Sequence, residues 1–132
     1  MRIFPGYGSE GFPRLAGKSP ESHATTDEIP PQADIPAPVL VKTVPREHYR
    51  VEKWEAYPFP GAAVPFLVLL PNNASDKNPV PVLFCIPGSD QTKEELAGET
   101  SPDLDQPSVQ QPGNNAMAFH YVRQGWAAIV VD

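Results

Sequence analysis

The segment Cys85–Asp90 carries the residues best suited to chemistry, because small and polar side chains directly follow an apolar run. In acyl transfer the tetrahedral intermediate carries a negatively charged oxygen, and backbone N–H groups at a turn after a strand can stabilise it. Gly88 would let the backbone approach that oxygen, and the N–H of Ser89 would donate a hydrogen bond to it. The sequence therefore predicts an oxyanion site at Gly88 and Ser89. An ordinary glycine turn after a strand is the alternative interpretation.

No catalytic nucleophile is evident in these 132 residues. The nucleophilic serine of many hydrolases lies in a GxSxG turn, and no such pentapeptide occurs in the sequence. Ser89 has Gln91 where the second glycine would stand, so we do not assign it that role. Cys85 lies within an apolar run and has no second cysteine to pair with, which predicts a buried thiol that takes no part in catalysis.

The histidines lack the pattern of a catalytic or metal site. His120 lies in a predicted helix beside aromatic residues, whereas a triad histidine follows the last strand on a loop, so we expect a packing or surface role. His23 and His48 precede the first predicted strand, which begins at Tyr49. No two histidines are spaced i,i+4 and no CxxC occurs, so we predict neither a metal nor a cofactor.

The apolar patterns that must position these residues predict an antiparallel hairpin followed by a parallel crossover. Residues 51–57 alternate, 58–61 interrupt the pattern with prolines and a glycine, and 62–70 are apolar, as in a hairpin. Val80–Ile86 and Trp126–Val131 are apolar at odd and even positions alike, which is typical of parallel strands buried on both faces. With helices between them, these two strands would lie side by side in an α/β fold.

Two short helices are expected between the two buried strands. Thr92 and Glu95 have the spacing of a capping box, and Gly98 could end the helix that they begin. A second helix, capped by an asparagine at 114–115, would carry apolar residues and end at Gly125. The polar, proline-containing loop between the helices is long and is not expected to contribute to the core.

Residues 1–46 differ in composition from the rest of the chain. Ten of the 18 prolines lie in the first 60 residues, where Pro-Gly, Pro-Pro and Pro-Ala-Pro steps oppose regular structure. We therefore expect a Pro-rich extended arm over 1–46 and one folded unit over 47–132. The arm could bind a partner or wrap around the folded unit.

The charge pattern and the N-terminal residues exclude several classes of partner. The net charge is −6, and Lys and Arg are scattered singly, so no basic patch could attract nucleic acid or anionic lipid. No apolar segment after Met1 resembles a signal peptide or is long enough to span a membrane. We expect neither nucleic acid nor a membrane as partner and, by default, a cytoplasmic protein.

Three stretches together resemble the start of an α/β-hydrolase, namely YRVEKWEAYPFPGAAVPFLVLLP, VPVLFCIPGSDQTKEELAGE and NAMAFHYVRQGWAAIVVD. They are similar to the acetyl xylan esterase and dienelactone-hydrolase-like branch, over roughly residues 47–132. The resemblance implies a hairpin, a third strand, the oxyanion loop, a first helix and a fourth strand that ends in Asp132. In that family the third strand usually ends in His-Gly, so Pro87 departs from the pattern. Asp132 could orient the adjoining loops or simply end its strand.

The resemblance implies a serine esterase that acts on an acylated carbohydrate or another small ester, to which this chain contributes the oxyanion loop but no nucleophile, acid or base. The apolar strand before Asp132 has nothing after it that could cover it, so we expect an incomplete hydrolase that is inactive alone and pairs with its missing C-terminal part. The alternative is a non-enzymatic interaction module, or a split half that binds another chain. A nucleotide-binding fragment is disfavoured, because neither GxGxxG nor GxxxxGK[ST] occurs.

Overall fold

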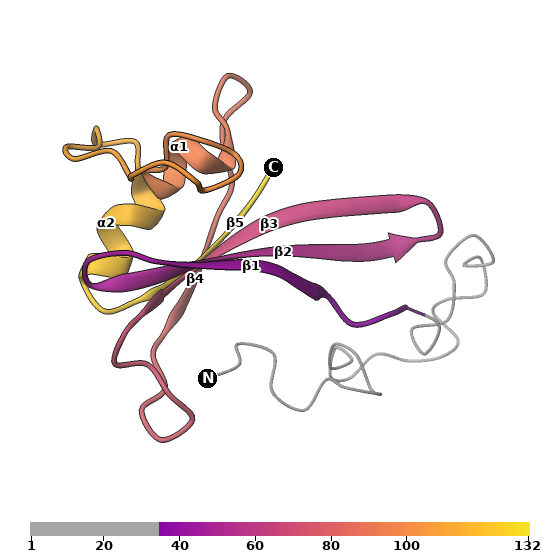
Figure 1. Ribbon diagram of the computed structural model, residues 1–132, viewed down its shortest axis with the longest axis horizontal. Helices are drawn as coiled ribbons and strands as arrows, with labels where there is room; N and C mark the ends of the chain where they lie inside the picture. The colour runs from indigo at the N-terminus through magenta and orange to yellow at the C-terminus, as the bar shows by residue number, and fades with distance from the viewer. Residues whose placement is uncertain (1–34) are drawn as a thin grey trace, which may run out of the picture.

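A computed structural model describes residues 35–132 as one mixed sheet with two short helices (Figure 1). The strands are β1 (Val39–Pro45), β2 (Tyr49–Phe59), β3 (Ala62–Pro71), β4 (Val82–Cys85) and β5 (Ala127–Val131), and the helices are α1 (Lys93–Ala97) and α2 (Met117–Arg123). The sheet order is β1-β2-β3-β5-β4, in which only the β4–β5 pair is parallel. The predicted α/β fold class is confirmed. Within residues 35–132, neither helix is long or apolar enough to cross a membrane.

The predicted hairpin and crossover are both present. β2 and β3 pair antiparallel, and Gly61 makes the turn between them with a φ of 80°. β5 lies between β3 and β4, antiparallel to the first and parallel to the second, with Ile129 opposite Phe84. The expectation that the two apolar runs lie side by side in the same direction is therefore confirmed.

The main core lies between the sheet and the two helices, which cover the same face (Figure 1). Successive side chains of a strand point to opposite faces. Every second residue of the inner strands therefore reaches the helices, and Leu96, Phe119 and Val122 meet them from the helical side. The strand residues of this core include Val51, Leu67, Leu69, Cys85, Ala128 and Val130.

The other face of the sheet carries a smaller cluster of Phe66, Val68 and Ile129, to which the helices contribute nothing. Phe84, on edge strand β4, is 66% exposed, and Ile86, which follows that strand, is 76% exposed. The prediction that both crossover strands are buried on both faces is wrong for β4 and right for β5. An apolar run does not reveal that its strand lies at the edge, where only one side has a neighbour.

Strand β1 lies within the segment that we assigned to the Pro-rich arm. It pairs antiparallel with β2, so the sheet begins before residue 47. Its side chains are mostly exposed, and the apolar residues Val39, Leu40 and Val41 are among them, so the apolar run there does not mark a buried face. The prolines at its boundaries are tolerated because β1 is an edge strand. The rest of the arm, residues 1–34, lies outside the described residues.

Helix α1 begins and ends as predicted. The N–H of Glu95 donates to the hydroxyl of Thr92 at 3.2 Å, and the Glu95 carboxylate accepts from the N–H of Thr92 at 2.9 Å, which completes the capping box. Gly98 ends the helix with a left-handed φ of 73°. This cap orients the helix directly after the loop that carries Gly88 and Ser89.

Helix α2 begins without the asparagine cap that we predicted. Ala116 occupies the N-cap position, and no side chain caps the helix there. The N–H of Ala116 instead donates to the carbonyl of Gly113 at 3.1 Å, so a turn that contains both asparagines precedes the helix. Gly125 follows the helix with a φ of 95°, as expected for a residue that reverses the chain into β5.

The long loop between the helices contributes to the core, contrary to our prediction. Leu104 is 2% exposed within the main core and has a φ of 58°, a conformation that is rare for residues other than glycine. Lys42 and Lys53 hold the loop against the sheet, because each donates a hydrogen bond to one of its backbone carbonyls, at 2.6 and 3.0 Å. Tertiary contacts have thus ordered a segment whose composition suggested a surface loop.

Candidate oxyanion site

The predicted site residues meet at one end of the sheet. β4 and β5 run parallel with Cys85 opposite Val130, so their carboxyl ends lie at the same edge. Gly88 and Ser89 follow β4 after two residues, Ile86 and Pro87, and Asp132 directly follows β5. In open α/β sheets, ligands bind outside the carboxyl ends of the strands. The structure therefore brings Gly88, Ser89 and Asp132 to the part of the fold where chemistry is expected.

The loop after β4 closes on itself through Gln91. The N–H of Gln91 donates to the carbonyl of Gly88 at 3.1 Å, and the N–H of Gly88 donates to the side-chain oxygen of Gln91 at 3.3 Å. Both Gly88 and Ser89 are exposed. No group within residues 35–132 accepts a hydrogen bond from the N–H of Ser89. The loop thus presents the backbone N–H groups of Ser89 and Asp90, neither of which has an acceptor within residues 35–132, to an incoming oxygen.

Gly88 is not a glycine that the fold itself requires. Its φ does not lie in the left-handed region, where the positive-φ glycines are Gly61, Gly98 and Gly125. A Cβ added at Gly88 would lie 3.4 Å from the Gln91 side-chain oxygen and 3.6 Å from a side-chain oxygen of Asp90, both ordinary contact distances. A need for glycine here would therefore come from whatever approaches the loop.

Asp132 links the end of β5 to the start of α1 through hydrogen bonds. One carboxylate oxygen accepts the backbone N–H of Lys93 at 2.7 Å, and the other accepts the ammonium group of Lys93 at 2.6 Å. Lys93 is the first residue of α1, so its position also fixes where the loop before it must end. Of the two roles left open for Asp132, its contacts favour a link to the adjoining loop.

Sequence reasoning did not find Lys93. Its side chain is 10% exposed and also contacts Glu94, at 3.1 Å. Burial by itself lowers the pKa of Lys93, but hydrogen bonds to Asp132 and Glu94 outweigh it and raise the pKa above its ordinary value. A lysine in the first turn of a predicted helix gives no signal of a partner 39 residues away.

A comparison with family models identifies the fold. A model of the Abhydrolase family matches residues 5–132 of the chain. The chain belongs to the Abhydrolase family. The match includes most of the segment that we expected to be an arm, which agrees with the presence of β1 in the sheet.

A solved structure agrees with this assignment. The Abhydrolase chain is 43% identical to a protein from Bacteroides fragilis described as a candidate acetyl xylan esterase, with a TM-score of 0.57. The match covers 74% of this chain and 25% of that protein, so the chain spans about a quarter of its relative's length. A search of curated proteins gives no match. The predicted resemblance to an α/β-hydrolase of the acetyl xylan esterase branch is confirmed.

The remaining candidate side chains, Cys85, His120 and His48, lie in different surroundings. Cys85 is 2% exposed, and burial raises the pKa of its thiol, so it lacks the properties of a nucleophile. His120 lies 2.9 Å through Nε2 from the carbonyl of Gly113 and packs against the ring of Phe119. His48 is exposed beside Glu47. No group of three potential metal ligands occurs within residues 35–132, and His23 lies outside them.

Proposed function

We propose that this Abhydrolase chain is part of a carboxylic-ester hydrolase of the acetyl esterase type, in which its loop at Gly88 and Ser89 stabilises the oxyanion. The observation that carries the proposal is the backbone N–H of Ser89, which has no acceptor within residues 35–132 and lies at the carboxyl end of β4. The Bacteroides fragilis relative supports an ester of an acylated carbohydrate, or a smaller ester, as substrate.

Each residue of the site would act in a defined way. Attack on the ester carbonyl moves negative charge onto its oxygen, and the Ser89 N–H would donate a hydrogen bond to that oxygen. Gly88, without a side chain, leaves the approach open. The link between Asp132 and Lys93 would hold α1, and with it the end of the loop, in place. The 132 residues contain no GxSxG, so the attacking serine and its histidine would come from outside them.

A matched pair of substitutions at Ser89 tests the proposal. We would replace the corresponding segment of the Bacteroides fragilis relative with this chain and measure hydrolysis of 4-nitrophenyl acetate by the chimera and its parent. Ser89→Pro removes the backbone N–H, whereas Ser89→Ala removes only the hydroxyl. We expect Ser89→Pro to lower kcat about 10²- to 10³-fold, as loss of one oxyanion donor does, and Ser89→Ala to stay near the unsubstituted chimera.

Three outcomes would contradict the proposed role of the Ser89 N–H or of this segment. If Ser89→Pro retains full activity, the N–H is not an oxyanion donor. If Ser89→Ala loses as much as Ser89→Pro, the hydroxyl is the group that matters. An unsubstituted chimera that folds but is inactive beside an active parent would contradict the functional equivalence of this segment. Circular dichroism of each protein checks that it has folded.

A second candidate function, a split half or interaction module, is favoured by the outer edge of β4. Within residues 35–132 no strand pairs with that edge. Phe84 and Ile86 expose apolar side chains beside it. An unpaired strand edge with an apolar flank can accept a further strand, so the remainder of a hydrolase or a separate chain could extend the sheet here.

This candidate is tested by the association of the 132-residue chain itself. We expect concentration-dependent association in light scattering coupled to size exclusion, and we expect the double variant Phe84→Ser/Ile86→Ser to reduce it. Val41→Ser is the matched control, because Val41 is 50% exposed on the opposite edge strand, β1. A chain that stays monomeric, or a control that reduces association as strongly, would contradict a docking role for β4.

A further inference from the structure

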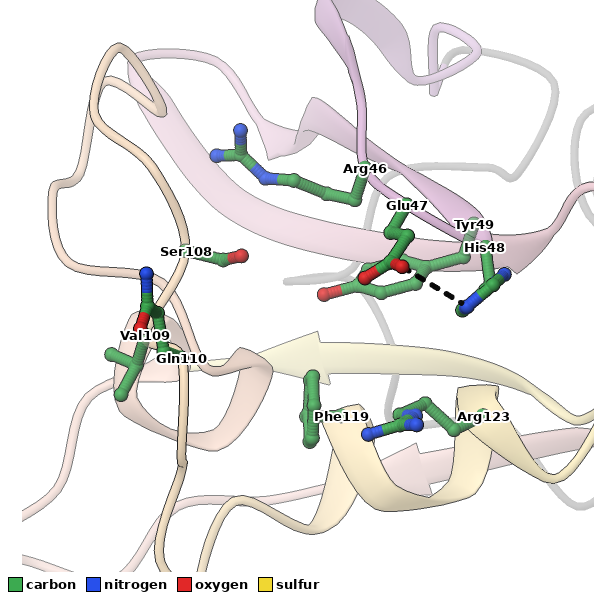
Figure 2. A pocket seen from close by; sticks show the side chains of 9 residues that line it. All are labelled: Arg46, Glu47, His48, Tyr49, Ser108, Val109, Gln110, Phe119 and Arg123. Atoms are coloured by element: carbon green, nitrogen blue, oxygen red, sulfur yellow. Dashed lines mark ion pairs between the residues drawn. The ribbon is translucent and has the colours of Figure 1, made fainter.

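A cavity of about 320 Å³ lies between the turn that joins β1 to β2, the loop around Val109, and α2 (Figure 2). It is separate from the oxyanion loop. Tyr49 begins β2 opposite Pro71, the last residue of β3, and β3 is antiparallel to β5. Tyr49 therefore marks the end of the sheet where β5 begins, whereas Ser89 follows the carboxyl end of β4.

The hydroxyl of Tyr49 lies beside this cavity, is buried from solvent and has no hydrogen-bond partner within the described residues. Tyr49 is 4% exposed, and its ring reaches from β2 toward the loop at Ser108, so the oxygen lies between Arg46 on one side and Phe119 on the other (Figure 2). Burial, and then the charge of Glu99, raise the pKa of Tyr49 to about 12, so the hydroxyl is a donor at neutral pH. A buried donor without an acceptor is rare and calls for an explanation.

Two charged groups that line the cavity have no permanent counter-charge among residues 35–132, namely the Arg123 guanidinium and the exposed Glu47 carboxylate. The Arg46 guanidinium pairs with Glu99, with Nε 3.2 Å from a carboxylate oxygen. Glu47 faces His48 at 3.6 Å, as the dashed line in Figure 2 marks. The guanidinium of Arg123 lies 5.4 Å from the centre of the Phe119 ring, and no carboxylate within residues 35–132 pairs with it. One cation and one hydroxyl donor thus lie beside the same space without an acceptor.

We propose that this cavity binds a small molecule through an anionic oxygen group, a carboxylate or a phosphate, that accepts hydrogen bonds from Tyr49 and Arg123. Such a group supplies the acceptor that the Tyr49 hydroxyl lacks and the charge that Arg123 lacks, and guanidinium binds both kinds of group with two parallel hydrogen bonds. The Phe119 ring supports the guanidinium from its face. The volume lies at the lower end of the range for small-molecule sites. The inference stands independently of the esterase proposal.

The test is a titration of the 132-residue chain followed by amide chemical shifts in NMR. Sodium acetate and sodium phosphate are the two probes, with sodium chloride at the same ionic strength as reference. We expect saturable shifts at Tyr49, Val109 and Arg123 with at least one probe. Saturation by acetate alone assigns a carboxylate, and saturation by phosphate alone assigns a phosphate.

Three variants connect the binding to the two donors. Arg123→Gln and Tyr49→Phe should each weaken binding about tenfold or more, as loss of a hydrogen bond to a charged group does. Lys77→Gln removes the same charge from an exposed loop and should leave the affinity unchanged. Without any anion, Tyr49→Phe should raise the thermal midpoint, because it deletes a buried hydroxyl that has no partner.

The proposal is overturned by any of three results. The first is the absence of saturable shifts with both acetate and phosphate. The second is an affinity that Arg123→Gln and Tyr49→Phe leave unchanged. The third is an equal loss in Lys77→Gln, which would indicate general attraction of anions. If Arg123→Gln fails to fold, Arg123→Lys replaces it, since it keeps the charge but lacks the paired donors and should still bind more weakly than the unsubstituted chain.

Discussion

The segments before and after α1 both contain a glycine, yet only the one after the helix is built into the core. Gly98 is buried in a left-handed conformation, and a Cβ there would lie 3.2–3.3 Å from Pro112 and Phe119. Gly88 is exposed, has an ordinary φ and has room for a Cβ. Packing therefore explains why position 98 needs glycine and does not explain position 88. A residue type that the fold leaves unexplained is where a functional role is best sought.

The largest effect on stability should come from Gly98→Ala. The left-handed backbone and the tight contacts with Pro112 and Phe119 both oppose a methyl group, so we expect the free energy of unfolding to fall by about 2–3 kcal/mol. Urea unfolding followed by tryptophan fluorescence measures it. A loss below about 0.5 kcal/mol, the level of an ordinary surface substitution, would remove the contrast between the two glycines.

Asp132→Ala should have the next largest effect and tests what holds the start of α1. It would leave the ammonium of Lys93 largely buried with Glu94 as its carboxylate partner. The Asp132 side chain is 43% exposed, so we expect a loss of about 1–2 kcal/mol, less than for a fully buried ion pair. Asp132→Asn keeps an acceptor for the backbone N–H and should lose about half as much. If Asp132→Ala changes the amide chemical shift of Gly98 more than that of Gly88, the result would contradict a role for Asp132 in holding the start of α1.

A third effect depends on pH and concerns Tyr49, whose pKa is influenced by Glu99 in the segment after α1. The pKa of Tyr49 is about 12 in the folded chain and about 10 when unfolded, chiefly through burial and then through Glu99. As the pH rises, the unfolded chain loses the Tyr49 proton at a lower pH than the folded chain does. The contribution of this proton to the free energy of unfolding is therefore complete below pH 10 and is lost as the pH rises toward 12. Absorbance at 295 nm should show one tyrosine titrating near pH 12 that is absent in Tyr49→Phe. If the absorbance lost in Tyr49→Phe lies near pH 10 instead, Tyr49 is more open to solvent.

The pattern of the sequence was sufficient to predict the hairpin, the parallel pair and the first helix. These elements depend on signals that are local in the chain, such as the apolar runs of β3 and β5 and the capping box at Thr92. Leu104 was missed because its position depends on partners distant in sequence, whereas β1, which pairs with the next strand along the chain, was missed because prolines flank it. Strand β1 has a mostly exposed surface but gains hydrogen bonds from β2, and the loop of Leu104 is held to the sheet by Lys42 and Lys53.

The same distinction applies to the candidate site. Its location was predictable, since a glycine directly after an apolar strand indicates the carboxyl end of that strand. Its supports were not, because the contact between Lys93 and Asp132 exists only once β4 and β5 pair. That the Ser89 N–H lacks an acceptor could not be predicted either, because the side-chain oxygen of Gln91 accepts from the N–H of Gly88 and not from that of Ser89.

Gly88→Ala should have the smallest effect on stability and is the sharpest test of the contrast between the two glycines. Its Cβ would meet only ordinary contacts, and alanine restricts the unfolded chain more than glycine, so we expect a change within about 0.5 kcal/mol or a slight gain. In the active chimera, the same substitution places a methyl group where the ester oxygen must approach Ser89, so kcat/KM should fall while the urea midpoint does not. Matched losses of stability and activity would mean that Gly88, like Gly98, is required for folding. Unchanged activity together with unchanged stability would show that the oxyanion is held elsewhere.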